Sequence, residues 1–277
     1  MTLDSAPPRS SLWLRVLAAV VLIPVTLASV YLGGWILAAW VGLAGLAMSM
    51  EWVQIVHRER FGWRFALHAL AIMSALGLAA AERPNLGWQA ILFCALAGAV
   101  AAQAREERAI WMILGIVYIA TPCLAFVWIR ELRPLGLESI AWLLAVVWTT
   151  DSIAYGVGSI AGGPKLAPLV SPKKTWAGAI AGIAGAALIS ALFALLSGSS
   201  STLWVVAAGV VLSLLTQMGD LAESQLKRTF GVKDMSDLIP GHGGALDRLD
   251  GLIFATLGLA ACILVTGLTP LAWMHGS

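Results

Sequence analysis

The stretch that decides the fold runs from Val16 to Met50 and reads VLAAVVLIPVTLASVYLGGWILAAWVGLAGLAMSM, without one charged residue. A bilayer core of about 30 Å is crossed by roughly 20 apolar helical residues, so this stretch is long enough for two spans. Gly33 and Gly34 in its middle predict a tight turn between them. The chain is therefore expected to begin with a pair of antiparallel membrane helices.

Similar apolar runs recur along the rest of the chain. Hydrophobic residues make up 60% of it before its 28 glycines are counted, against about 45–50% with glycine included in soluble domains. Several of the 13 tryptophans fall at the edges of these runs, as in membrane interfaces. We expect spans near residues 14–32, 35–51, 65–81, 88–104, 109–129, 139–161, 176–196, 203–220 and 251–270. The sequence thus predicts an all-α integral membrane protein with about nine transmembrane helices.

Positive charge is distributed unevenly among the connecting loops. If the N-terminus is cytoplasmic, all but three of the 17 lysines and arginines fall on the cytoplasmic side, the exceptions being Arg83, Arg130 and Arg133. Cytoplasmic loops are enriched in these residues, so we expect the N-terminus inside and the C-terminus outside. The two longest polar loops, 162–175 and 221–250, would then both face the cytoplasm.

Net charge and cysteine content exclude several classes of protein. The formal net charge is only +2, which gives no overall basic field for nucleic acid. The 3 cysteines stand far apart in apolar runs without a C-x-x-C pair, which argues against disulfides and zinc. Residues 9–32 show no clear cleavage site, so we expect a retained helix rather than a signal peptide.

Acidic residues divide the chain into two regions. Of the 15 acidic residues, seven lie between Asp151 and Asp250. We expect residues 1–138 to be an N-terminal scaffold of transmembrane helices, because their short charged connectors suggest no chemistry. Residues 139–277 are expected to form the catalytic region.

Asp151 interrupts an otherwise apolar run from Trp142 to Gly158. A carboxylate at that depth costs about 2.5–3.5 kcal/mol on insertion scales, so it needs a partner, a wet cavity or a metal. The alternative is that Asp151 caps a second, shorter helix that begins near Thr149.

The segment Ser171-Pro-Lys-Lys-Thr-Trp176 leads into the seventh predicted span. Ser171 can cap that helix and Pro172 suits its first turn, which would leave an anion site at the helix N-terminus. Two lysines and two hydroxyl groups beside such a site suit a polyphosphate. The alternative is that the two lysines only fix the orientation of the segment in the membrane, by the positive-inside rule, for which their charge is enough. The candidate substrate-binding residues here are Ser171, Lys173, Lys174 and Thr175.

The densest polar segment covers residues 220–250. Spacings of three, four and seven place Asp220, Glu223, Ser224 and Lys227 on one face of a continuing helix. Farther on, twin glycines let a backbone approach a ligand closely, and two aspartates three apart mark the entry to the ninth helix. An ordinary solvated loop has no reason to combine carboxylates, cations, a histidine and twin glycines. The further candidates are Arg228, Lys233, Asp234, His242, Gly243, Gly244, Asp247 and Arg248.

Carboxylates with lysine and arginine, and without a histidine or cysteine cluster, suit Mg²⁺ rather than zinc or copper. Neither a P-loop nor a G-x-S-x-G elbow is present, which disfavours a Ser224, His242 and Asp247 hydrolase. A metal with cations facing the cytoplasm suggests phosphoryl or nucleotidyl transfer. An acceptor reached from within the membrane would be a lipid.

These residues carry a family resemblance. The pattern Ser224-x2-Lys227-Arg228-x4-Lys233-Asp234-x-Ser236-x2-Ile239-Pro240-x-His242-Gly243-Gly244-x2-Asp247-Arg248-x-Asp250 resembles the signature of phosphatidate cytidylyltransferases, also called CDP-diacylglycerol synthases. The segments Lys165-Leu-Ala-Pro168 and Ser171 to Trp176, and Thr150-Asp151-Ser152-x-Ala154-Tyr155, are similar to other stretches of that family. The match covers about residues 145–251. Ala177, where the family often has Glu, and Ala245, where a larger aliphatic is usual, depart from it.

The resemblance implies the reaction of CTP with phosphatidate to give CDP-diacylglycerol and pyrophosphate, an early step of phospholipid synthesis. It implies Mg²⁺ as cofactor and a multi-pass enzyme whose active site faces the cytoplasm, in a bacterial inner membrane or an organelle. Members are often dimers, although no interface motif here requires a homodimer. On both lines of argument we assign Asp220, Asp247 and Asp151 to the metal, and Asp220, Asp247, Lys227 and His242 to catalysis.

Two other classes of function stay open at this point. A secondary transporter of an anionic solute is compatible with nine spans, an intramembrane Asp151 and a Gly/Pro-rich stretch at 156–172. Transporters usually show a repeat in two halves and a midplane site, whereas here the polar residues crowd at one edge of one half. A non-catalytic protein that only binds membrane lipids would show no turnover at all.

Overall fold

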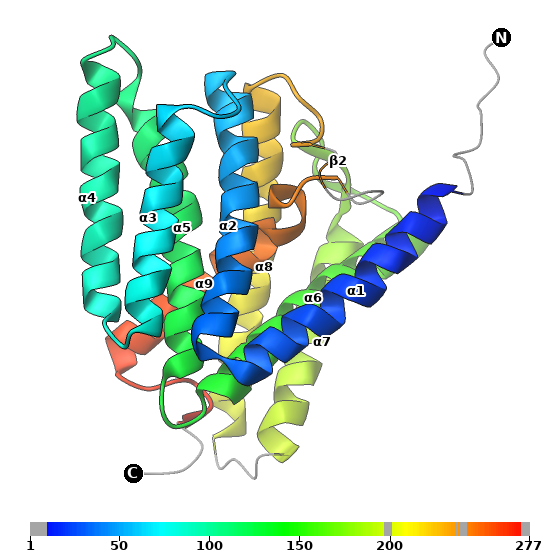
Figure 1. Ribbon diagram of the computed structural model, residues 1–277. Helices are drawn as coiled ribbons and strands as arrows, with labels where there is room; N and C mark the ends of the chain where they lie inside the picture. The colour runs from blue at the N-terminus through cyan, green and yellow to red at the C-terminus, as the bar shows by residue number, and fades with distance from the viewer. Residues whose placement is uncertain (1–9, 197–200, 237, 239–242, 273–277) are drawn as a thin grey trace, which may run out of the picture.

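The computed structural model describes residues 10–196, 201–236, 238 and 243–272, and of residues 10–12 and 14–17 only the backbone. In this part of the chain nine helices and one two-stranded hairpin form (Figure 1). The helices are α1 (Ser10–Leu32), α2 (Gly34–His57), α3 (Trp63–Ala80), α4 (Pro84–Gln103), α5 (Ala109–Glu131), α6 (Gly136–Ala161), α7 (Trp176–Leu196), α8 (Thr202–Thr229) and α9 (Leu246–Thr266). The strands are β1 (Lys165–Ala167) and β2 (Ser171–Thr175), which pair antiparallel.

The helices confirm the prediction of an all-α membrane protein. Among the described residues, 8 helices, α2 to α9, are long and apolar enough to cross a membrane, and α1 has a shorter apolar stretch over Ala18–Leu32. The predicted spans agree with the helices to within a few residues, except that α8 continues to Thr229. This extension carries the polar face that the spacing of Asp220, Glu223 and Lys227 predicts.

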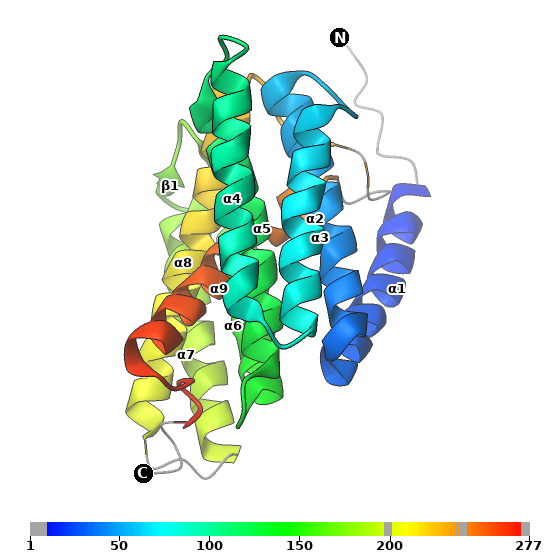
Figure 2. The same cartoon turned by 60° about the vertical axis from the view of Figure 1, so that its left-hand side comes forward.

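Helices α2 to α5 stand side by side in one group, and α6 to α8 form a second group (Figure 1). Helix α9 packs along α8 and also contacts α5, α6 and α2, so it joins the two groups. Helix α1 lies on the outside of the bundle (Figure 2), where it contacts α2 and α6. The hairpin and the end of α8 lie at the same end of the bundle, as the two polar loops are expected to do.

The glycine turn between the first two helices forms as predicted. Gly33 has a φ of 66°, in the left-handed region that favours glycine. The backbone N–H of Gly34 donates to Oε1 of Glu131 at 2.8 Å, and the Arg130 guanidinium donates to the carbonyl oxygen of Tyr31 at 2.7 Å. The end of α5 therefore holds the α1–α2 turn in place.

The prediction that Ser171 caps the seventh helix is wrong. Residues 171–175 form strand β2, and α7 begins only at Trp176. Backbone groups of this segment pair with strand β1, so they are not free at a helix N-terminus. Thr175 takes the capping position instead, since its Oγ1 accepts a hydrogen bond from the Gly178 N–H at 3.2 Å. The expected anion site at Ser171 and Pro172 is therefore not formed in this way.

Helix α6 runs without interruption from Gly136 through Asp151 to Ala161. Asp151 thus stands inside a continuous helix and does not cap a second one, which removes the alternative interpretation. Its side chain is exposed rather than packed in the core.

Candidate active site

Two aspartates meet where α8 and α9 cross. A Cβ atom on Gly219 would stand 2.4 Å from the carbonyl oxygen of Asp250, and one on Gly251 would stand 2.7 Å from Cγ2 of Thr216. Only glycine allows this approach, because any larger side chain would push the helices apart. As a result the carboxyl group of Asp250 lies against that of Asp220.

The hairpin brings a lysine to this pair of carboxylates. Nζ of Lys174, on β2, lies 2.6 Å from Oδ2 of Asp220. Asp151, on α6, is close enough to interact electrostatically with both of these residues. The hairpin, α6, α8 and α9 therefore converge on one polar site, as the sequence analysis requires.

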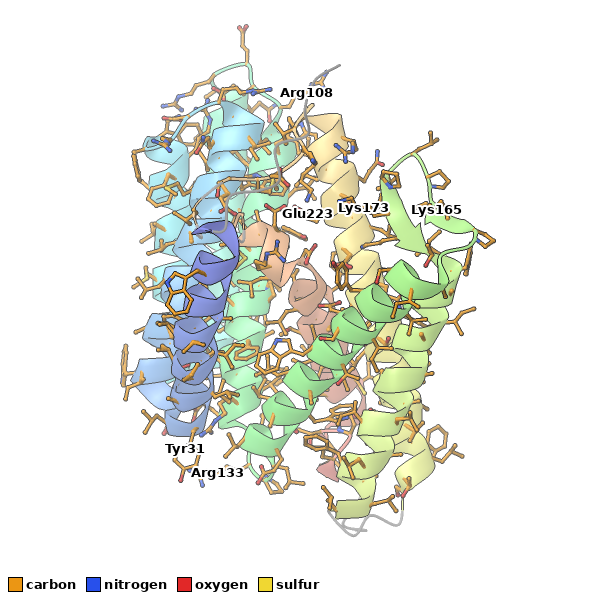
Figure 3. The ribbon with its side chains drawn as sticks, turned by 90° about the vertical axis from the view of Figure 1, so that its right-hand side faces the viewer. Tyr31, Arg108, Arg133, Lys165, Lys173 and Glu223 are labelled. Atoms are coloured by element: carbon orange, nitrogen blue, oxygen red, sulfur yellow. The ribbon has the colours of Figure 1, made fainter. Side chains whose placement is uncertain are left out.

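A second charged cluster lies further along α8. Nζ of Lys227 lies 2.7 Å from Oε2 of Glu223 and 2.7 Å from Oδ1 of Asp247. The exposed fractions of these side chains are 13% for Lys227, 1% for Glu223 and 8% for Asp247. Burial of this kind requires the charges to be paired, because an isolated charge away from water is costly. Figure 3 shows Glu223 in the interior of the bundle.

Asp247 also organises the loop before α9. Its Oδ2 accepts hydrogen bonds from the backbone N–H groups of Met235 and Gly244, both at 3.0 Å. With Lys227 on the other oxygen, both oxygens of Asp247 are already engaged. The carboxylate that faces Asp220 is Asp250, which the sequence analysis does not assign to the metal.

The twin glycines serve the packing of this loop. Gly243 has a φ of 88°, which disfavours any other residue. A Cβ atom on Gly244 would stand 2.9 Å from both Oδ2 of Asp247 and Oε1 of Glu51. These glycines let the backbone approach two carboxylates of the protein itself.

Glu51 is a site residue that the sequence analysis misses. It is fully buried on α2, and its Oε1 accepts hydrogen bonds from Ser236 Oγ at 2.6 Å and from the Ala245 N–H at 2.8 Å. Its Oε2 accepts a hydrogen bond from the Leu246 N–H at 2.8 Å. Glu51 therefore satisfies the N-terminus of α9 from a helix of the N-terminal half. Its signal in the sequence is a lone carboxylate at the end of the predicted span 35–51, which by itself indicates only a span boundary.

Most of the remaining predicted residues are exposed or half-buried. Arg228 is exposed and donates to the carbonyl oxygen of Val232 at 3.3 Å. Lys173 projects from the hairpin on the same side of the molecule as Lys165, and both stand toward the end that carries Arg108 (Figure 3). Of the other predicted residues, Lys233, Asp234 and Arg248 are exposed, Ser171 and Ser224 are half-buried, and His242 lies outside the described residues.

Within the described ranges, no three histidine, cysteine, aspartate or glutamate side chains converge as a preformed metal cage. Mg²⁺ does not require one, since it usually takes one or two carboxylates and completes its octahedron with water and substrate phosphate. The adjacent carboxylates of Asp220 and Asp250 fit that requirement.

The fold and the site define a class of protein, namely a polytopic membrane protein with a polar site of carboxylates and lysine. Comparison with known proteins makes the assignment more specific. The Cytidylyltransferase family matches residues 13–266, and the chain belongs to this family.

The names of similar proteins agree with this membership. A phosphatidate cytidylyltransferase of Brucella abortus is 38% identical over 252 residues, which cover 89% of this chain and 91% of the relative. A phosphatidate cytidylyltransferase of Bacillus subtilis is 40% identical over 142 residues, covering 51% of this chain and 53% of the relative. That of Staphylococcus saprophyticus is 37% identical over 147 residues, or 53% of this chain and 55% of the relative.

Proposed function

We propose that this protein transfers the cytidylyl group of CTP to phosphatidate and releases pyrophosphate. The observation that carries the proposal is the contact of Lys174 with Asp220, beside Asp250, which joins the hairpin to the crossing of α8 and α9. Carboxylates for a metal and a cation for phosphate then stand at one point of a membrane bundle. Family membership and the names of the relatives support the same reaction.

In the proposed reaction a phosphate oxygen of phosphatidate attacks the α-phosphorus of CTP. A phosphorus–oxygen bond forms there as the bond to the β-phosphate breaks, and pyrophosphate leaves with the electron pair. The attacking oxygen is already anionic, so no strong general base is needed. The work of the protein is to position the reactants and to neutralise charge.

Asp220 and Asp250 would hold Mg²⁺, with Asp151 near enough to contribute. When bound, the metal would neutralise the triphosphate and polarise the α-phosphate. Lys174 would move from Asp220 toward phosphate or remain as a neutralising partner. Lys227, held by Glu223 and Asp247, would keep the loop before α9 in the geometry that admits the nucleotide.

We further propose a bacterial inner membrane with the site facing the cytoplasm. Lys165, Lys173 and Arg108 stand toward one end of the bundle, while Arg133 stands at the other (Figure 3). The excess of lysine and arginine at the first end favours its cytoplasmic placement. CTP would then reach the site from the cytoplasm and phosphatidate from the inner leaflet. A homodimer stays a prediction for cross-linking to test.

The deciding experiment measures pyrophosphate release by the purified protein in detergent micelles, where no sealed compartment exists. We expect release from CTP only when both phosphatidate and Mg²⁺ are present, with CDP-diacylglycerol formed in equal amount. A chelator should stop the reaction, and added Mg²⁺ should restore it. Binding of CTP or lipid without turnover would point to a transporter or a lipid-binding protein and would overturn the proposal.

A further inference from the structure

An apolar cavity of about 510 Å³ opens beside the polar site. It lies between α1 and α2 on one side and α5, α6 and α9 on the other, at the junction of the two helix groups. Its size falls within the roughly 300–1,000 Å³ typical of sites for small molecules. The start of α9 contributes Ala245, Arg248 and Leu249 to its wall, so the cavity reaches the segment that carries Asp247 and Asp250.

The residues that line the cavity favour a hydrocarbon ligand. Almost all its described residues are aliphatic or aromatic, and the polar groups among them are Thr26, Thr256, Arg248 and the indole nitrogens of Trp40 and Trp148. The Trp40 nitrogen already donates to Thr26 Oγ1 at 3.1 Å. A nucleotide would find few partners along this wall and would lose its hydration there. An alkyl chain gives up no hydrogen bonds by entering, because it makes none.

The cavity has one charged end and one open edge. Among the described residues of its wall, Arg248 is the one that carries a charge, and it stands on the turn of α9 between Asp247 and Asp250. On the α1 and α2 side, two lining residues remain exposed, Ile23 at 45% and Leu43 at 62%. Such apolar exposure within membrane helices faces lipid, so a molecule can enter from the bilayer. The shape suits a ligand with an anionic head and an apolar tail.

We propose that this cavity holds one acyl chain of phosphatidate, with the lipid phosphate held near Arg248 and directed toward Asp220 and Asp250. The inference rests on the proposed function and locates its lipid substrate. Charge complementarity at Arg248, which lies on the same turn of α9 as Asp250, favours the substrate over a bulk phospholipid. It follows that helices of both halves contact the acyl chain, whereas the residues that contact the phosphates come from the C-terminal half.

The test narrows the cavity by a substitution and compares phosphatidates with long and short acyl chains. Ala44 lines the cavity, whereas Ala39 is an exposed residue of the same helix outside it. For A44W we expect the KM for dioleoyl phosphatidate, measured in mixed micelles, to rise roughly tenfold, as when about two methylene groups lose their burial. The KM for dihexanoyl phosphatidate and for CTP should stay the same. A39W should match the wild type with both lipids.

A second measurement does not depend on how A44W folds. Wild-type protein is irradiated with a phosphatidate that carries a diazirine at mid-chain, and labelled peptides are mapped. We expect labels on α2 and α9 residues of the cavity, with competition by phosphatidate but not by phosphatidylcholine. Equal competition by both lipids, labels elsewhere, or an unchanged chain-length profile in A44W would overturn the inference. If the wild type makes no CDP-diacylglycerol from either lipid, the proposed function has failed instead.

Discussion

The two helix groups of this molecule differ in how they use polar residues. Helices α6 to α9, with the hairpin, contribute two charged clusters. In one, Lys174 and Asp250 lie against Asp220, and in the other Lys227 pairs with Asp247. Helices α1 to α5 contribute much of the buried apolar core and, among the described contacts, one carboxylate, Glu51, to the same region. The difference shows that the charged side chains of the site come from one part of the chain. The residue that stabilises the start of α9 comes from the other part.

The largest effect is expected from D220N, which tests the chemical side of this comparison. Loss of one well-placed electrostatic contact typically costs about 10²–10³ in rate, and a metal ligand should reach the upper end. We expect turnover to fall by at least that factor while membrane insertion and thermal stability remain close to those of the wild type. Pyrophosphate release and a thermal melt in detergent measure the two properties.

The control for D220N is E138Q, an exposed carboxylate in the first turn of α6. It should retain full activity, because Glu138 belongs to none of the contacts of the site. A well-inserted D220N with near wild-type turnover would contradict the metal assignment.

Next in size is the effect of K227M on stability. The change leaves the buried carboxylates of Glu223 and Asp247 without their shared cation. Removing one partner of a buried ion pair typically costs about 3–5 kcal/mol, so we expect a clear loss of unfolding free energy together with activity. The double variant K227M/E223Q should recover part of the stability, since it removes one uncompensated charge. If K227M alone were as stable as the wild type, the cluster would not support the fold.

Glu51 tests whether the N-terminal half supports the site. E51A removes the acceptor for Ser236, Ala245 and Leu246 and leaves the start of α9 unsatisfied. We expect a loss of about 2–4 kcal/mol in unfolding free energy, with faster hydrogen exchange at residues 243–246 and a lower kcat. E51Q keeps one acceptor oxygen and should lie between E51A and the wild type. Unchanged exchange in E51A would show that the two halves are independent here.

The smallest effect is expected within the hairpin. Lys173 is exposed, whereas Lys174 contacts Asp220. K173A should raise the KM for CTP by less than tenfold, and the difference from the wild type should shrink at high salt, because exposed charges are screened. K174A should have the larger effect on kcat. Equal effects of the two variants would show that the contact with Asp220 does not position Lys174.

The helices could be predicted because membrane spans depend on local composition. The apolar runs, the turn at Gly33 and the polar face that extends α8 all follow from the order of residues along one segment. The start of α7 could not be predicted in this way, because Ser171 suits a helix cap as well as a strand. Pairing with β1 makes this segment a strand rather than the start of a helix. The pairing joins residues on opposite sides of a turn, so the segment alone does not reveal it.

The sequence by itself determined the class of protein, the helix count to within one and the segments that carry the charged residues. Only the tertiary structure decided which charges meet. Asp250 rather than Asp247 lies against Asp220, because Gly219 and Gly251 let α8 and α9 cross closely at that level. Helix packing also decided the role of Glu51. A buried carboxylate pairs with the unsatisfied N–H groups that packing brings to it, and packing is not local in sequence.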